Sequence, residues 1–216
     1  MRFNVFDRAV DVAVRVVAVA MYVGAVLVGV ATVAVHAQTP TPAPTIQFGL
    51  EPGQIAVMEA GFDYAYVHAN APPGECGCFS LEGFGGGFAI NGIHGISGVV
   101  DLATAKADGV NGTTQNIRIF NILGGPRYSF RTRSRFTPYG QVLLGASEET
   151  SNLAFISVKN AFAVSGGVGV NRALGRYFGW KIVEASYIYS QLPNARNNDQ
   201  NDFRITTGIF LRMGPR

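Results

Sequence analysis

From residue 57 onward, apolar residues recur at every second position in eight separate segments. In the most regular segment, Phe162, Val164 and Val168 alternate with polar or small residues such as Ser165 and Gly167. A period of two is that of a β-strand with one apolar and one polar face. The predicted strands are residues 57–68, 83–93, 96–106, 116–130, 136–147, 161–172, 180–190 and 202–213. Each is long enough to cross the hydrocarbon core of a bilayer at a tilt, which takes about 9–11 residues.

The connections between these segments alternate strictly between short and long. The short ones are residues 92–95, 131–135 and 173–177, and the long polar ones are residues 68–82, 107–115, 148–159 and 191–201. A barrel in the outer membrane has this rhythm, with tight turns in the periplasm and longer loops outside, whereas a soluble sandwich has no reason to keep it. We therefore predict an all-β fold: a single closed antiparallel up-and-down transmembrane β-barrel of about eight strands in the bacterial outer membrane.

The composition fits strands that have only one apolar face. The chain has 27 Gly, 15 Phe and 8 Tyr, and only 14% of its residues are charged. In the second predicted strand one face carries Phe84 and Phe88 while the other carries Gly83, Gly85 and Gly87. Inward glycines leave room in a narrow lumen for larger side chains from neighbouring strands. A soluble barrel around an apolar ligand would need the aromatic face inside, and the glycine-rich faces argue against that alternative.

The N-terminal segment differs in kind from the rest of the chain. Three arginines, the last of them Arg15, precede an uncharged apolar run over residues 16–35, and Val35 and Ala37 then provide small residues at the positions that a signal peptidase reads. We predict a helical signal peptide over residues 1–37, cleaved before Gln38. Because the apolar run is also long enough to span a bilayer as a helix, an uncleaved anchor is the alternative.

The predicted mature chain has two parts. Residues 38–53 are rich in Pro and Thr and form an extended periplasmic leader, and residues 54–216 form the barrel. Without residues 1–37 the chain keeps 14 basic and 12 acidic residues, so it is nearly neutral. This balance offers no basic surface for a nucleic acid, and nucleic-acid partners are therefore not expected.

Five short motifs in the barrel region occur in a characteristic order. They are Glu59–Tyr64, Ile122–Ser129, Thr137–Gln141, Gly166–Gly169 and Thr207–Arg212. Through them, residues 55–213 resemble the small porin-like, eight-stranded outer-membrane barrels of the outer membrane protein A transmembrane-domain type. The resemblance implies a barrel whose interior is filled by polar and charged side chains rather than by a wide channel. The sequence departs from that family in having no peptidoglycan-binding domain after the last predicted strand, so a cell-wall tether is not expected.

The strand phases place one set of charged and amide side chains on the inward faces. This set is Glu59, Asp63, Asp101, Arg127, Gln141, Glu184 and Arg204. Opposite charges in a confined interior have to pair, because an unpaired ion there is costly. One interpretation is a gate, in which a change of ion-pair partners opens a narrow water path. The interpretation we favour is a static polar plug that holds the barrel in shape.

Cys76 and Cys78 lie in the first long connection, an oxidising location after export. A disulfide between them is the favoured state, and metal binding is the alternative. Without nearby His, Asp or Cys partners the two thiols fall short of the four ligands of a structural metal site, so neither a metal nor another cofactor is expected.

The chemistry of an enzyme is not evident in the predicted barrel. His68 and His94 are the only histidines after the signal segment, and they fall near opposite ends of predicted strands. A Ser/His pair at one rim is therefore not expected, and we predict that the protein is not an enzyme. The outward aromatic residues are assigned to lipid contact and to girdles at the membrane interface.

These observations together predict a non-enzymatic outer-membrane protein that contributes to envelope structure and presents four loops outside, with a lumen plugged by polar and charged side chains. Its expected partners are outer-membrane lipid and lipopolysaccharide, the barrel-assembly machinery and an unidentified ligand at the loops. The alternative function is a narrow gated pore for small solutes or ions, although the interior of an eight-stranded barrel is about filled by side chains.

Overall fold

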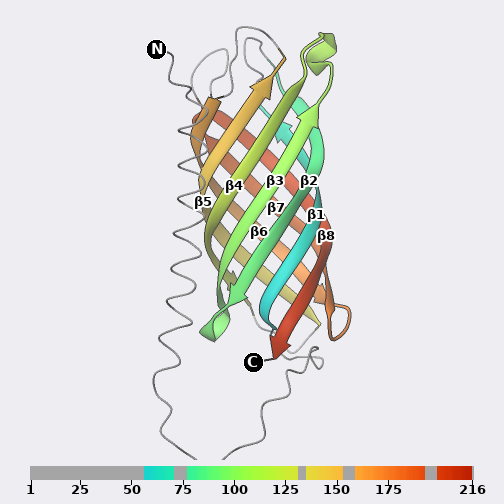
Figure 1. The fold of residues 1–216 in the computed structure, drawn as a ribbon, viewed down its shortest axis with the longest axis vertical. Coiled ribbons are helices and arrows are strands. Elements are labelled where there is room, and N and C mark those ends of the chain that lie inside the picture. The colour runs from blue at the N-terminus through green and yellow to red at the C-terminus, as the bar shows by residue number, and fades with distance from the viewer. Residues whose placement is uncertain (1–55, 71–76, 131–134, 153–158, 193–198, 216) are drawn as a thin grey trace, which may run out of the picture. The chain divides into compact units, whose positions relative to one another are not determined.

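The computed structural model describes residues 56–70, 77–130, 135–152, 159–192 and 199–215. Eight long strands follow one another in this part of the chain and wind into a barrel (Figure 1). The strands are β1 (Ala56–Ala69), β2 (Phe79–Asn91), β3 (Ile96–Ala107), β4 (Ile117–Ser129), β5 (Phe136–Ser151), β6 (Lys159–Ala173), β7 (Phe178–Ser190) and β8 (Gln200–Pro215).

The connections contain two single turns of 3₁₀-helix, η1 (Ile93–Gly95) before β3 and η2 (Val110–Gly112) after it. Within the described ranges, no helix has the length and the apolar character needed to cross a membrane. The predicted signal peptide, residues 1–37, and the predicted leader, residues 38–53, lie outside the described residues, and both stay predictions.

The sheet closes on itself. Each strand pairs antiparallel with the next one in the chain, and β8 returns to pair with β1. In this closing pair Asp63 lies opposite Gly208, and Met58 lies opposite Met213. Closure leaves no open sheet edge, which is what a sheet surrounded by hydrocarbon requires. The predicted closed antiparallel barrel of eight strands is confirmed.

Two strands extend further into the long connections than predicted. β2 begins at Phe79 and β5 ends at Ser151, whereas the prediction began the first at residue 83 and ended the second at residue 147. Leu81 and Glu149 are both buried at inward positions, so the alternation continues into these segments. Pairing with the neighbouring strands thus overrides the small and polar residues that suggested loops.

The outer wall of the barrel is apolar. On every strand the large hydrophobic side chains that point outward are exposed, for example Phe62 at 59%, Val168 at 65% and Ile209 at 57%. These are positions that the alternation assigned to the outward face. The inward positions hold buried small, polar and charged residues, together with buried Leu, Ile, Val and Phe side chains. An apolar exterior around an interior that holds polar and charged side chains is the arrangement of a transmembrane barrel.

β7 departs from strict alternation at one place. Lys181 pairs with Gly208 and Glu184 pairs with Thr206, so two residues of β7 stand opposite one residue of β8. Such a bulge shifts the phase of a strand by one residue. As a result Lys181 and Glu184 are both buried inside the barrel, although an uninterrupted strand would put them on opposite faces.

The loop end of the lumen is apolar where β1 to β4 enclose it, and we call these residues the loop-end cluster. Its buried members are Val67, Ala69, Phe79, Leu81, Ala105, Val110, Ile117 and Ile119. The resemblance implied an interior filled by polar and charged side chains, and this end of the lumen differs from that expectation. The reason is that the inward positions near the loop ends of β1, β2 and β4 carry Val, Leu and Ile rather than polar residues.

Candidate functional site

The middle of the lumen is occupied by charged and hydrogen-bonding side chains from six strands, and we call this set the lumen network. Its members are Asp63 (β1), Asp101 (β3), Arg127 (β4), Tyr139 and Gln141 (β5), Lys181, Glu184 and Ser186 (β7) and Arg204 (β8). All of them are buried, with exposed fractions of 8% or less. They meet because each occupies an inward position of a strand that faces the same narrow interior.

Glu184 is the centre of the lumen network. Its carboxylate accepts hydrogen bonds from the Tyr139 hydroxyl at 2.7 Å and from Gln141 Nε2 at 3.0 Å. Two cations also approach it: Lys181 Nζ lies 3.5 Å from Oε2, and Arg204 Nη2 lies 3.7 Å from Oε1. A carboxylate that is only 1% exposed needs this many partners, because burying a charge is costly unless it is paired and hydrogen-bonded.

The two cations beside Glu184 extend the network across the lumen. Lys181 Nζ donates to Asp63 Oδ2 at 2.6 Å, which joins β7 to β1. Arg204 Nη1 donates to Asp101 Oδ1 at 2.8 Å, which joins β8 to β3. Its Nε donates to Ser186 Oγ on β7 at 3.2 Å. Since β8 and β3 are not neighbours in the sheet, the Arg204 side chain crosses the interior to reach its partner. The ion pairs thus form one continuous chain from β1 to β3.

Arg127 belongs to the same network through β5. Its Nε donates to Gln141 Oε1 at 2.9 Å, and its guanidinium carbon lies 4.4 Å from the centroid of the Tyr139 ring. This is the distance of a cation–π contact, which is stronger where water is excluded. Arg127, Lys181 and Arg204 together balance the three carboxylates of the network.

Gly169 provides the space for Tyr139, the largest neutral side chain of the lumen network. Gly169 on β6 lies directly opposite Tyr139 on β5. A Cβ atom at residue 169 would lie 2.6 Å from Cζ of the tyrosine ring, closer than carbon atoms can approach. The absence of a side chain at Gly169 therefore lets the ring enter the lumen, which is the role expected for inward glycines.

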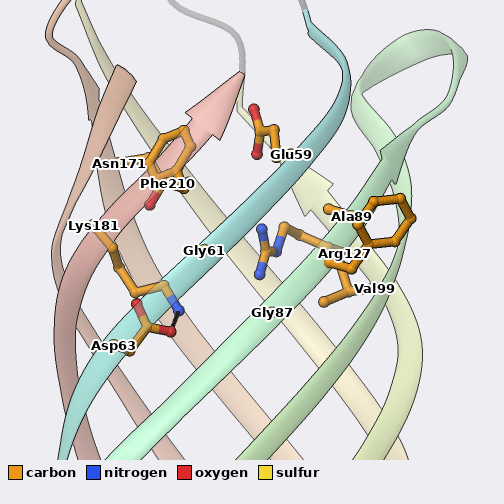
Figure 2. A pocket seen from close by; sticks show the side chains of 11 residues that line it. Glu59, Gly61, Asp63, Gly87, Ala89, Val99, Arg127, Asn171, Lys181 and Phe210 are labelled. Carbon is orange, nitrogen blue, oxygen red and sulfur yellow. Dashed lines mark hydrogen bonds and ion pairs between the residues drawn. The ribbon is translucent and has the colours of Figure 1, made fainter. Parts of the chain in front are cut away.

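A small cavity of about 30 Å³ lies beside the network, toward the turn end of the barrel. Its polar lining comes from Glu59, Asp63, Arg127, Asn171 and Lys181. Figure 2 shows Lys181 reaching Asp63, while Arg127 and Glu59 lie around the same space. Among the described residues, Oδ1 of Asp63 and Oδ1 of Asn171 have no hydrogen-bond partner. A polar cavity of this size has room for water, which requires roughly 10–15 Å³.

The structure brings six of the seven predicted lumen residues into the lumen network, and Glu59 lines the neighbouring cavity. Sequence reasoning missed Lys181 and Tyr139. Tyr139 stands at the same phase as Gln141 in β5, so the alternation itself could have found it. No pattern in the sequence signals Lys181, because its inward position depends on the bulge in β7.

Two further predictions concern cysteine and histidine. Cys78 is exposed, and Cys76 lies outside the described residues, so a disulfide between them stays a prediction. His68 lies at the loop end of β1 and His94 in η1 at the opposite end, as expected. Contrary to the expectation that no Ser/His pair forms, His68 Nδ1 lies 3.3 Å from Ser80 Oγ on the outer wall, because the β1–β2 register places the two residues directly opposite each other. That hydroxyl is shared with Tyr66, whose own hydroxyl lies 2.8 Å away.

Within the described ranges, no group of three or more His, Cys, Asp and Glu side chains is placed to hold a metal ion.

The sequence matches no family model and no curated protein. Solved structures do match. Neisserial surface protein A is 16% identical, with a TM-score of 0.58 over 73% of this chain and 98% of that one. The outer membrane protein OprG from Pseudomonas aeruginosa is 14% identical, with a TM-score of 0.50 over 76% of this chain and 100% of that one.

At these identities the likeness concerns the fold. It agrees with the closed register, the apolar outer wall and the charged interior described above. An apolar wall around a polar lumen is stable only where hydrocarbon surrounds it. The chain has the fold of the small eight-stranded outer-membrane barrels, and it is a protein of the bacterial outer membrane.

Proposed function

We propose that the protein is a non-enzymatic structural component of the outer membrane, with a lumen closed by the lumen network and with its loops presented outside the cell. The observation that carries this proposal is the continuous chain of ion pairs from Asp63 through Lys181, Glu184 and Arg204 to Asp101. A chain of this kind ties four strands together across the interior. It occupies the space that a conducting path would need.

The dimensions of the lumen support the same reading. An eight-stranded barrel has an interior just wide enough for its own side chains. The cavity beside the network, at about 30 Å³, has room for molecules of the size of water rather than for a solute. The loop-end cluster adds an apolar barrier, with Leu81 and Ile117 at 0% and 1% exposure.

A narrow gated pore for ions is the second candidate. It is favoured by one observation: Lys181 Nζ lies within reach of two carboxylates, 2.6 Å from Asp63 and 3.5 Å from Glu184. A lysine that moved fully from one partner to the other would enlarge the polar space next to the cavity. Such a change of partner is the physical form that a gate would take here.

The partners that we propose follow from the surroundings of the barrel. They are outer-membrane lipid and lipopolysaccharide at the wall, the barrel-assembly machinery during folding, and an unidentified ligand at the loops. The exposed aromatic residues of the wall support the first of these, because amphipathic rings favour the membrane interface.

Planar-bilayer conductance distinguishes the two functions. The mature protein is first refolded in detergent. A shift in gel mobility between boiled and unboiled samples then establishes that the barrel has formed. We expect a folded, heat-shifted protein that conducts no current. A steady conductance that disappears in Arg127→Ala or Glu59→Ala but persists in the exposed control Arg135→Ala would instead establish the gated pore.

A further inference from the structure

The outer wall carries a groove of about 490 Å³ over β1 to β4. Its floor is the backbone of glycines 85–87, and the rings of Phe62, Phe84, Phe88 and Phe120 stand around it. β2, β3 and β4 lie side by side on the face turned to the viewer in Figure 1. The groove lies near the middle of these strands, so it opens toward the hydrocarbon that surrounds the barrel.

The shape of the groove depends on one outward glycine. Gly86 lies between Phe84 and Phe88 at the outward phase of β2, where the alternation calls for another large side chain. A Cβ atom there would lie 3.0 Å from the carbonyl oxygen of Gly61 on β1. On the β1 side, the rings of Phe62 and Phe84 stack at 5.6 Å and form a wall. An apolar groove with aromatic side chains along it is suited to a hydrocarbon chain.

Two basic residues stand at the loop end of this groove, and we call them the basic pair. Lys106 on β3 and Arg118 on β4 lie directly opposite each other, and both are exposed on the outer wall. Each is the next outward residue after one that lines the groove, Thr104 on β3 and Phe120 on β4. Like charges directly opposite each other on paired strands are destabilising. An anion held between the two side chains would remove that repulsion.

Carboxylates near the basic pair do not replace such an anion. Lys106 Nζ lies 3.4 Å from Asp108 Oδ2, but these side chains are 65% and 68% exposed, and exposed ion pairs contribute little. Glu82 lies opposite Lys106 on β2, where it also interacts with the Tyr64 hydroxyl. Arg118 has an uncharged residue, a threonine, opposite it on β5, and the nearest carboxylate on the outward face of that strand, Glu148, lies opposite Phe120 instead.

We propose that the groove and the basic pair form one binding site for lipopolysaccharide, with a phosphate of its sugar headgroup between Lys106 and Arg118 and an acyl chain in the groove. The basic pair is at the end of the barrel with the longer connections, which faces outward in barrels of this kind. The lipid of the outer leaflet is the one that carries phosphorylated sugars and acyl chains together. The proposal rests on the placement of the barrel in the outer membrane, and it is independent of whether the lumen conducts.

Native mass spectrometry of the folded full-length mature protein in detergent tests the site, with lipid A as the probe and phosphatidylglycerol and phosphatidylethanolamine as comparisons. We expect one lipid A to remain bound per barrel at concentrations where neither phospholipid does. The double variant Lys106→Gln/Arg118→Gln should weaken this binding by about tenfold or more, which is the scale that two charges near a lipid headgroup contribute. Val100→Trp, which fills the groove from β3, should also weaken it.

Matched controls separate the site from the rest of the wall. Arg135→Gln removes an exposed charge at the turn end, and Val168→Trp adds the same ring at an exposed position outside the groove. Both should bind lipid A as the unmodified protein does, and every variant must keep its heat-shifted gel mobility. The proposal is overturned if lipid A binding is absent, if all variants bind equally, or if phosphatidylglycerol binds as well as lipid A. A conducting barrel that still binds lipid A would overturn only the plugged lumen.

Discussion

The lumen network and the loop-end cluster fill the same barrel by different means. In the network, Arg204 is 1% exposed and is paired with two particular carboxylates, Asp101 at 2.8 Å and Glu184 at 3.7 Å. In the cluster, Leu81 is 0% exposed and packs among apolar side chains. Buried charges need partners in a fixed geometry, whereas apolar contacts have no direction. The lumen network is thus specified by pairing, and the loop-end cluster is specified by volume.

The largest expected effect comes from removing a charge from the lumen network. Arg204→Met keeps much of the side-chain length but leaves Asp101 and Glu184 without their shared cation. Breaking a buried pair in this way costs roughly 3–5 kcal/mol. We expect the urea midpoint of the folded barrel in lipid vesicles, followed by gel mobility and circular dichroism, to fall accordingly.

Two variants decide whether pairing is the cause of that loss. Arg204→Lys should recover little of the stability, because an ammonium cannot reproduce the donor geometry of a guanidinium. Adding Asp101→Asn to Arg204→Met should recover part of it, because the unpaired carboxylate is then gone. If Arg204→Met unfolds at the same urea concentration as the unmodified protein, the network does not stabilise the barrel.

An intermediate effect is expected from the loop-end cluster. Leu81→Ala leaves a cavity among the buried side chains, which costs roughly 2–5 kcal/mol. Leu81→Met, which conserves volume, should cost less than about 1.5 kcal/mol. The same urea titration measures both variants. Equal losses for the two would contradict the view that this end of the lumen is specified by volume, and would remove the contrast with Arg204.

The smallest expected effect tests the space that the network needs. Gly169→Ala places a methyl group against the Tyr139 ring, and overpacking of this kind costs roughly 1–3 kcal/mol. Gly166→Ala is the matched control on the same strand, since a Cβ atom there meets nothing within 4 Å. When gel mobility is followed against temperature, the unfolding temperature should be lower for Gly169→Ala alone. A matching loss in both would point to the general cost of changing glycine in β6 rather than to the Tyr139 contact.

The alternation of the sequence predicts most of this fold because a barrel strand has only two faces. Once Phe62 and Tyr64 are assigned to the outer wall, Asp63 must face the lumen, and the same logic holds for Asp101 and Arg204. The strand ends are harder to predict, as the early start of β2 at residue 79 shows. They are decided by pairing with a neighbour, which is not visible in a single segment.

The ion-pair partners within the lumen network could not be predicted from the alternation. The ion-pair partner of a charged lumen residue depends on the stagger between strands and on the tilt of the strands around the interior. Neither can be inferred from the sequence of one strand. Asp63 finds its partner on β7 only because a bulge turns Lys181 inward. The groove on the outer wall was equally hidden, because it needs β1, β2, β3 and β4 in register around Gly86.

The pairing of β1 with β8 has a consequence for how the protein comes into being. Asp63 meets Gly208 across this seam, and its cation on β7 also arrives late in the chain. Until the last strand has been synthesised and exported, β1 has one unsatisfied edge, and unsatisfied edges invite pairing with other chains. Contacts between distant parts of a sequence also form slowly. A chain truncated after β7 would therefore keep an open sheet edge and aggregate rather than close into a smaller barrel. The barrel can close only after β8 has been exported.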